Sequence, residues 1–280
     1  MRVPAARAVP AASRGVRLAA GLLIALIALA LLGPLLSPFD ALQLDWRSVA
    51  HPPDLVAGHW LGTDRLGRDL FARTLEGLRL SLALGVIASV VSIATGLAYG
   101  AVAGYLGGRT DELMMRFVEI LSGLPLLFFV IFVTVLFGHS EALLFLAIGA
   151  VGWLTLARIV RGETLSVRRR EFIDAAIVAG AGTPRIIWRH VVPNVAGTVV
   201  VYATLAVPQI ILLESFLSFL GLGIGEPRAS LGTLIAEGAG ELESAPWMLL
   251  APGSVLVLLL LSLNLLGDGL RDRLAGDERP

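Results

Sequence analysis

Six long apolar runs constrain this chain more than any other feature of its sequence. A hydrocarbon core about 30 Å thick requires about 20 consecutive apolar residues in a helix. Six runs approach that length, and they cover residues 18–36, 81–106, 117–137, 142–157, 195–213 and 248–266. The fourth is the shortest, but Arg158 and Arg161 flank it and can extend it by reaching toward the interface. The runs predict an all-α integral membrane protein with six transmembrane helices.

The first run has a basic flank, as a secretory signal peptide does. It is too long for a typical signal-peptide core, and no small-x-small cleavage site follows it. We therefore expect an uncleaved anchor. Composition agrees with a polytopic protein, because 56% of the 280 residues are hydrophobic and 16% are charged.

Arginine distribution predicts the orientation in the membrane. All 22 basic residues are Arg, and with the N-terminus inside, sixteen of them fall in the N-tail, residues 107–116 and 158–194, and the C-tail. Six fall on the other side. The positive-inside rule then places both termini in the cytoplasm. The predicted divisions are a cytoplasmic tail at 1–17, the first span at 18–36, an extracytoplasmic loop at 37–80, a core transmembrane domain at 81–274 and a cytoplasmic tail at 275–280.

Missing residue types exclude several functions. A phosphate-binding P-loop needs a Lys, and the chain has none, so it carries no intact Walker A site. With no Cys, disulfides and thiolate sites are excluded as well.

An ion-coupled carrier usually places ionisable groups near the bilayer midplane. Glu119 and Glu214 lie at the ends of the third and fifth runs, where we expect solvated or cap-paired carboxylates. A solute pathway in this chain would therefore take its energy from a partner.

A polar, basic segment of residues 168–194, here called the basic island, separates the fourth and fifth runs. Phe172, Ala175, Ala176 and Ala179 recur at helical spacing and form a narrow face of mostly small side chains. Gly180 and Gly182 then favour a break. Thr183 is placed to cap a second short helix, with Pro184 at its first position and Pro193 at its end. That helix has Ile186, Ile187, His190 and Val191 on one side and Arg185 and Arg189 on the other.

The pattern alone leaves two interpretations of the basic island open. It fits an amphipathic helix lying on anionic lipid, and it also fits a docking element for a cytoplasmic protein. Nucleic-acid binding is disfavoured, because a segment tethered by spans at both ends can hardly enter a major groove.

A membrane enzyme is another alternative for the whole chain, but none of the four His residues lies in an apolar run or has a catalytic partner at a recognisable spacing. His51 and His59 share a loop with Asp54 and Asp64, which is a weak metal signal.

Small residues and prolines mark the apolar runs. Gly85, Ser89, Ser92 and Gly96 form one face of the second run, which is more typical of close helix packing than of a pore lining. Pro125 and Pro208 lie inside the third and fifth runs. They can bend those helices and free backbone carbonyls.

The basic island resembles the EAA loop of bacterial ABC-importer permeases. The similar positions are Asp174-Ala175-Ala176, Gly180, Ile187 and Val192-Pro193-Asn194. In that family the loop is the coupling helix, which docks in a groove of the cytoplasmic ATPase. The resemblance implies that Phe172, Asp174, Ala175, Ala176, Ala179, Gly180, Ile187 and Pro193 belong to an ATPase-coupling loop. Asp174 departs from the family's usual Glu.

Four further segments, in the same order, are similar to the C-type permease of dipeptide, oligopeptide and nickel importers. They are Gly62-Thr63-Asp64 with Gly67-Arg68-Asp69, the stretch 104–116, Ser218 to Gly223, and Asn264 to Asp272. Leu231 departs from the family, which often has Trp there. We interpret Gly62, Thr63, Asp64, Gly67, Arg68 and Asp69 as structural, with Thr63 or Asp64 capping the next helix and Asp64 paired with Arg68. Asn264, Gly267 and Asp268 are interpreted as groups at a helix end.

The resemblance implies a function and a set of partners. It implies the permease subunit of an ATP-driven importer in the bacterial inner membrane, forming half of the pathway for peptides or a related solute such as nickel. It implies a second permease as heterodimer partner, two cytoplasmic ATPases that use ATP and Mg, and an extracytoplasmic solute-binding protein. The chain itself would bind no cofactor and would not be an enzyme. A stand-alone secondary carrier or channel with a cytoplasmic interaction loop remains the alternative.

Overall fold

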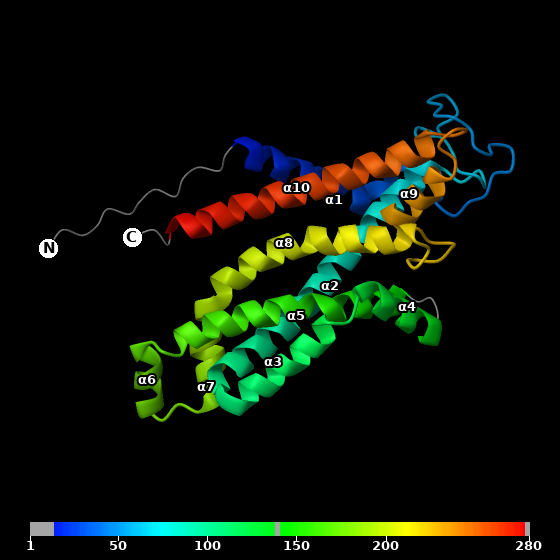
Figure 1. Ribbon diagram of the computed structural model, residues 1–280. Helices are drawn as coiled ribbons and strands as arrows, with labels where there is room; N and C mark the ends of the chain where they lie inside the picture. The colour runs from blue at the N-terminus through cyan, green and yellow to red at the C-terminus, as the bar shows by residue number, and fades with distance from the viewer. Residues whose placement is uncertain (1–13, 138–140, 278–280) are drawn as a thin grey trace.

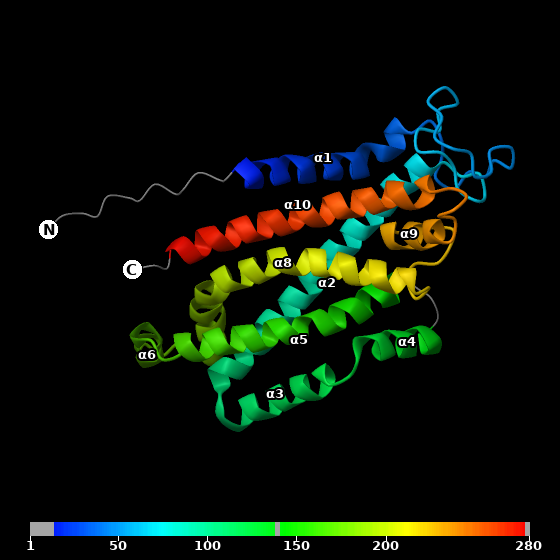
Figure 2. The same cartoon turned by 45° about the horizontal axis from the view of Figure 1, so that its top comes forward.

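The computed structural model describes residues 14–137 and 141–277, and the regular secondary structure of the described chain is helical apart from two isolated β-bridges. Figures 1 and 2 show an elongated bundle of roughly parallel helices crossed by one diagonal helix. The helices are α1 (Arg14–Leu36), α2 (Leu70–Leu106), α3 (Gly108–Ser122), α4 (Leu126–Phe137), α5 (Glu141–Val167), α6 (Glu171–Val178), α7 (Thr183–Ile186), the π-helix η1 (Ile187–Val191), α8 (Val192–Phe219), α9 (Leu231–Ala239) and α10 (Trp247–Asp277).

Four helices of the described chain are long and apolar enough to cross a membrane. They are α1, α2, the continuous helix of α7, η1 and α8, and α10. A fifth span is present if the bent pair α3 and α4 is counted as one. The predicted run 142–157 lies within α5, which is not among these helices. The structure therefore establishes an all-α membrane protein with four or five apolar spans.

The predicted third span, 117–137, is not one continuous helix. It is divided between α3 and α4, whose axes differ by 84°. The break falls at Gly123, Leu124 and Pro125. Proline disfavours helical backbone at the preceding residue and has no N–H to donate, so a helix tends to end before it. Hydrogen bonding resumes when Phe129 N–H donates to the Pro125 carbonyl at 3.2 Å. The prediction that Pro125 bends this run is confirmed.

Helix α2 is the centre of the bundle and is longer than predicted. Its 37 residues span about 55 Å, well beyond the hydrocarbon thickness. It begins at Leu70, with Asp69 as its N-cap, so the external loop predicted at 37–80 ends at Asp69. The Asp69 carboxylate accepts from the Ala72 N–H at 2.8 Å. In Figures 1 and 2, α2 passes diagonally between the ends of the bundle.

Glycines on α2 allow α5 to approach closely. A Cβ added to Gly96 would lie 2.9 Å from the Trp153 carbonyl oxygen, and one added to Gly104 would lie 2.7 Å from that of Arg161. Gly100, between them, faces the Ala157 carbonyl. On another part of α2, Gly85 faces Ile211 of α8. The predicted small-residue packing face is confirmed, and it continues two turns beyond the predicted residues.

The two ends of the bundle differ in what they carry. The loop of residues 37–69 and α9 lie together at one end, and α6 and α7 lie at the other (Figures 1 and 2). The start of α1 and the end of α10 point toward the α6 end. Following the predicted orientation, we call the end with α9 the outer end and the end with α6 the inner end.

Candidate functional site

At the inner end, α6 buries one residue and exposes most of its length. Ile173 is fully buried and Ala176 is half-buried, and both pack against the bundle. The face predicted from the sequence is thus split. Phe172, Ala175 and Ala179 are exposed, whereas Ala176 contacts the core. The Asp174 carboxylate is exposed too and has no ion pair with any described residue.

The exposed part of α6 is strongly apolar. Val178 is 88% exposed, Ile177 is 52% exposed and Phe172 is 38% exposed. Together with Ala175 and Ala179 these residues form what we call the α6 surface. Sequence reasoning missed Ile177 and Val178, although both are apolar residues within the predicted helix. Val178 borders the small-residue face, whereas Ile177 lies about 140° around the helix from Phe172. Exposed apolar residues of this kind mark an interaction site.

A Schellman motif ends α6. Ala181 N–H donates to the Ala176 carbonyl at 3.0 Å, and Gly180 N–H donates to the Ile177 carbonyl at 2.9 Å. Gly180 has φ +82°, which a residue with a side chain adopts only with strain. The predicted break is confirmed, but the predicted cap is wrong. Gly182 is the N-cap of α7, and Thr183 and Pro184 are its first two residues, because the chain is already helical at Thr183.

Pro193 does not end the second island helix. The π-helix η1 follows α7 directly and α8 begins at Val192, so the helix continues into the fifth apolar run. A proline removes one N–H donor from a helix. In the π-helix just before Pro193, Val192 N–H donates to the Ile187 carbonyl, five residues back instead of four. This wider hydrogen bonding accommodates Pro193 without a break in the helix.

The basic island is anchored to the bundle by apolar contacts. Ile173, Ile186, Ile187 and Val191 pack in one cluster with residues of α2 and α5. The predicted apolar side of the second helix is therefore buried, while Arg185 and Arg189 are exposed as expected. Nearby, Arg161 of α5 makes a two-pronged ion pair with Asp111 of α3, at 2.7 and 2.6 Å. Movement of the island would be transmitted to α5 and α8.

At the outer end, a buried ion-pair network surrounds Asp64. Its carboxylate accepts from Arg68 Nε at 2.6 Å and from Arg73 Nη1. Arg73 also pairs with Glu237 of α9 at 3.2 Å, and Arg68 pairs with Glu226 at 3.2 Å. We call these five residues the outer network. It joins the loop of residues 37–69 to α2 and to α9.

Burial opposes ionisation of Asp64, but the charge of Arg73 and the hydrogen bonds from Arg68 outweigh it and lower the pKa of this carboxyl below its ordinary value. The predicted Asp64/Arg68 ion pair is confirmed. The predicted cap is wrong, because Asp69, not Thr63 or Asp64, caps α2. Sequence reasoning missed Arg73, Glu226 and Glu237, because no local spacing links residues that far apart along the chain.

The remaining residues of the outer motif shape the loop. Thr63 accepts from the His51 N–H at 2.8 Å, and its hydroxyl donates to the Ser48 carbonyl. Gly62 and Gly67 have φ +78° and +74°, and Gly67 leaves no room for a Cβ beside the Asp45 carbonyl.

His59 is a packed loop residue. It is hydrogen-bonded to Asp69 at 2.9 Å and stacked on Phe39 with ring centroids 4.3 Å apart. No group of three metal-ligating side chains occurs within residues 14–137 and 141–277.

The C-terminal motif lies inside a helix rather than at its end, because α10 continues to Asp277. Asn264 is exposed and its amide donates to the Leu260 carbonyl at 2.9 Å. Gly267 packs against Leu205 of α8, and Asp268 is exposed. Leu231 is fully buried at the start of α9.

Glu214 is buried rather than solvated. Its side chain is 0% exposed, and it accepts from Ser218 at 2.6 Å and from Ser81 of α2 at 3.5 Å. The hydroxyl of Ser230, the cap of α9, donates in turn to Ser218 at 3.3 Å. Of the two environments expected for Glu214, the solvated one is wrong, because α9 folds over the end of α8, whereas Glu214 is paired near a helix cap through Ser218 and the α9 cap Ser230. The corresponding expectation for Glu119 holds, since it is exposed and lies 3.7 Å from Arg116.

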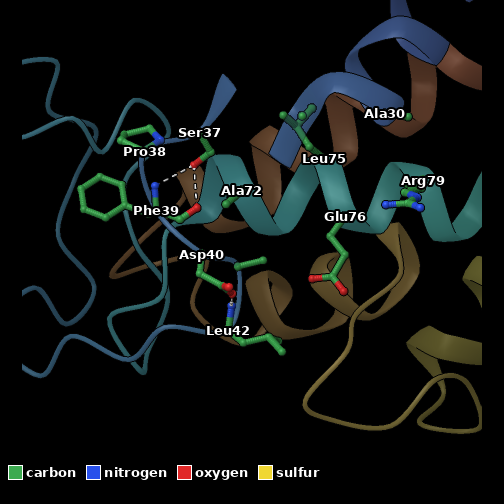
Figure 3. Close-up of a pocket in the computed structure, with 12 residues that line it drawn as sticks. Ala30, Ser37, Pro38, Phe39, Asp40, Leu42, Ala72, Leu75, Glu76 and Arg79 are labelled. Carbon is green, nitrogen blue, oxygen red and sulfur yellow. Dashed lines mark hydrogen bonds between the residues drawn. The ribbon is translucent and has the colours of Figure 1, made fainter. Parts of the chain in front are cut away.

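An open cavity of about 470 Å³ separates α1 from α2 near the outer end. Figure 3 shows Ser37, Phe39 and Asp40 on one side, and Glu76 and Arg79 along α2. The Ser37 hydroxyl donates to the Phe39 carbonyl at 2.9 Å, which folds the chain back at the end of α1. Hydrogen bonds within the loop therefore shape the wall of this cavity.

Comparison with known proteins identifies the family. Residues 96–279 match the model of the binding-protein-dependent transport system inner membrane component. The oligopeptide transport system permease protein OppC of Escherichia coli is 51% identical over 266 residues, which cover 94% of this chain and 88% of the relative. OppC of Haemophilus influenzae is 50% identical over 88% of this chain and 79% of its own length. The dipeptide transport system permease protein DppC of Bacillus subtilis is 44% identical over 90% of this chain and 79% of its own length. The chain therefore belongs to the family of inner membrane components of binding-protein-dependent transport systems.

Proposed function

We propose that this chain is the permease subunit of an ATP-driven ABC importer and forms half of a translocation pathway for di- or oligopeptides. The observation that carries the proposal is identity of about one half with oligopeptide permeases along nearly the whole chain. The alignment includes both candidate regions, the outer network and the basic island. Peptides are favoured over nickel, because the relatives compared here are named for oligopeptide and dipeptide transport.

The proposed topology has six spans with both termini in the cytoplasm. The third span is the broken pair α3 and α4, and the fourth is α5. Sixteen of the 22 Arg residues then lie on the cytoplasmic side, and the positive-inside rule supports that orientation. The arrangement of the helices is consistent with it, because the start of α1 and the end of α10 point toward α6 (Figure 1).

Two valines offer a matched test of this orientation in a chain that contains no Cys. Val56 is 99% exposed at the outer end, and Val178 is highly exposed at the inner end. In cells lacking the ATPases, a membrane-impermeant maleimide should label Val56→Cys directly and Val178→Cys only after permeabilisation. The opposite pattern would reverse the proposed orientation.

The α6 surface is the proposed attachment point for the ATPases, so α6 is the proposed coupling helix. Its support is the exposed apolar area of Phe172, Ile177 and Val178, held on the bundle through Ile173. ATP and Mg would be bound by the two ATPase subunits and no cofactor by this chain. Displacement of α6 would tilt α5 and α8 as near-rigid elements, because the island packs against both.

The assembly proposed for transport contains a second permease, two ATPases and an extracytoplasmic solute-binding protein. The decisive experiment reconstitutes these five chains in liposomes and measures uptake of radiolabelled tri-alanine with and without internal ATP. Uptake that requires ATP and the binding protein is expected. Uptake of tri-alanine by the purified chain alone, without ATP, would favour a secondary carrier or channel instead.

A further inference from the structure

A small cavity lies between α2, α5 and α8. Its volume is about 180 Å³, and four of its ten lining residues are polar. The polar residues are Ser92 of α2, Thr155 of α5, and Tyr202 and Gln209 of α8. No charged side chain lines it. The cavity is separate from the outer network and from the basic island.

Two of these polar side chains are exposed although they belong to spans. Gln209 and Thr155 are both exposed, and neither makes a hydrogen bond to any described residue. An unpaired amide or hydroxyl that faces hydrocarbon is energetically costly, because nothing there can replace its hydrogen bonds to water. Polar groups in spans therefore face a bundle interior or a water-filled cavity rather than lipid. We therefore expect Gln209 and Thr155 to face a polar interior of the assembled transporter, beside the exposed apolar Leu212 and Phe216 on the same side of α8.

The other two polar side chains stiffen the wall. The Tyr202 hydroxyl donates to the Gly152 carbonyl at 3.1 Å, and the Ser92 hydroxyl donates to the Gly149 carbonyl at 3.2 Å. Each hydroxyl is fixed in position by this bond and keeps free acceptor capacity. The Gln209 amide adds both a donor and an acceptor.

We propose that this wall, with Gln209 as its principal residue, hydrogen-bonds the backbone amides of the peptide as it passes through the membrane. This inference rests on the proposed function. A peptide backbone presents neutral donors and acceptors at every residue, which matches an uncharged wall of hydroxyls and a carboxamide. Such contacts are independent of side-chain identity, and passage requires sites weak enough to release the solute. A wall without charge would not hold a peptide by its charged ends.

The size of the cavity indicates that this chain supplies only one side of the site. Ligand pockets usually have volumes of about 300–1,000 Å³, well above the volume found here. A peptide would therefore contact this wall with part of its length. The facing wall would come from the second permease, as the proposed heterodimer requires.

The first test uses uptake by the reconstituted five-chain assembly. Gln209→Leu removes the amide at nearly constant size, and Thr155→Val removes the hydroxyl. We expect Gln209→Leu to lower tri-alanine uptake about tenfold, the effect of about 1.4 kcal/mol, with a smaller loss for Thr155→Val. Assembly of the complex and its basal ATPase rate should not change. Thr95→Val is the matched control, because Thr95 is an exposed span residue outside the cavity, and its uptake should equal wild type.

The second test detects contact directly and remains informative if Gln209→Leu does not assemble. Gln209→Cys is compared with Val200→Cys, nine residues away and so on the opposite face of α8. A tripeptide with a bromoacetyl group on its middle side chain should couple to the first variant only, and only when ATP and the binding protein are present.

The results separate this inference from the proposed function. If the wild-type assembly shows no ATP-dependent tri-alanine uptake, the proposed function fails and this inference fails with it. If the wild type transports tri-alanine while Gln209→Leu transports equally well, or coupling to the two Cys variants is equal, only the peptide-contact wall is refuted.

Discussion

The outer and inner ends of this bundle differ in the residues that they bury and the residues that they expose. At the outer end, Asp64, Arg68 and Arg73 are buried, and their charges are satisfied by one another and by Glu226 and Glu237. At the inner end, most of α6 is exposed and much of the exposed surface is apolar. The charges of the outer network are satisfied within one chain, whereas the α6 surface at the inner end is one that a partner would cover.

This difference has a physical origin in the cost of burying charge. Buried ions must be paired and hydrogen-bonded with good geometry, so they permit few arrangements of the segments that carry them. The outer network therefore fixes the loop of residues 37–69 against α2 and α9. Apolar packing through one side of α6 is less directional. It anchors the helix and leaves the other side available for docking.

Removal of the Arg73 side chain should give the largest effect, which is a loss of stability at the outer end. In Arg73→Ala, the buried Asp64 loses one of its two cationic partners and Glu237 loses its closest one. Breaking a buried ion pair from one side costs about 3–5 kcal/mol. The melting temperature of the purified chain in detergent should fall sharply, and uptake should fall with it.

Arg79→Ala is the matched control for this substitution. Arg79 lies on the same helix, is exposed, and borders the cavity shown in Figure 3. Its removal should leave the melting temperature close to that of the wild type. Equal melting temperatures for the two variants would show that the outer network does not hold the outer end together.

Truncation of Phe172 should give the next largest effect and should act on binding, not on stability. Loss of an aromatic side chain at the centre of an interface costs about 2 kcal/mol or more, which is a decrease in affinity of about thirtyfold. Phe172→Ala should therefore weaken capture of the ATPases while the melting temperature of the isolated chain stays near wild type.

The same substitution at the outer part of α8, Phe216→Ala, controls for loss of an exposed aromatic ring. It should leave ATPase capture intact. Full ATPase capture by Phe172→Ala would remove α6 from its proposed role. A reduced melting temperature would instead indicate that Phe172 supports the fold.

Acidification should weaken the outer end by a smaller amount. The folded-state pKa of Asp64 is lowered, so its stabilising contribution is fully present above the ordinary Asp pKa of 3.8 and is lost as pH falls through the folded-state value. The melting temperature of Asp64→Asn should lie below wild type at neutral pH, and the difference should narrow as pH falls below about 4. A difference that does not change with pH would mean that charge on Asp64 is not what stabilises the network.

Local features of the fold were predictable because their physical causes lie within a few residues. The apolar runs, the glycine break at Gly180, the bend at Pro125 and the Asp64/Arg68 pair all follow from short-range spacing, and the structure contains each of them. The capping residues of α2 and α7 were misassigned. Several polar residues near each helix start compete for that position, and tertiary contacts decide among them.

Features that depend on distant segments were not predictable from one sequence. Glu237 meets Arg73 only because α9 folds back over the outer end of α2, and the same fold-back buries Glu214. Continuation of the helix through Pro193 depends on the π-helix η1, for which the sequence carries no clear signal. The polar wall around Gln209 also needed the structure, because its residues come from three separate helices.

Conversion of Glu214 to Gln should give the smallest effect, and it separates transport powered by a partner from ion coupling. Glu214 is a fully buried carboxyl within a span of the described chain, and groups of that kind carry protons in ion-coupled carriers. Here its partners are hydroxyls that donate to it, including Ser218 at 2.6 Å. A Gln side chain keeps an acceptor oxygen and nearly the same size, so Glu214→Gln should change stability by less than about 1 kcal/mol and preserve most of the uptake. Glu214→Ala, which leaves the buried hydroxyls without their acceptor, should cost about 1–3 kcal/mol. Loss of ATP-dependent uptake in Glu214→Gln, with a melting temperature like that of the wild type, would mean that transport requires the ionisable carboxyl itself and would reopen the case for ion coupling.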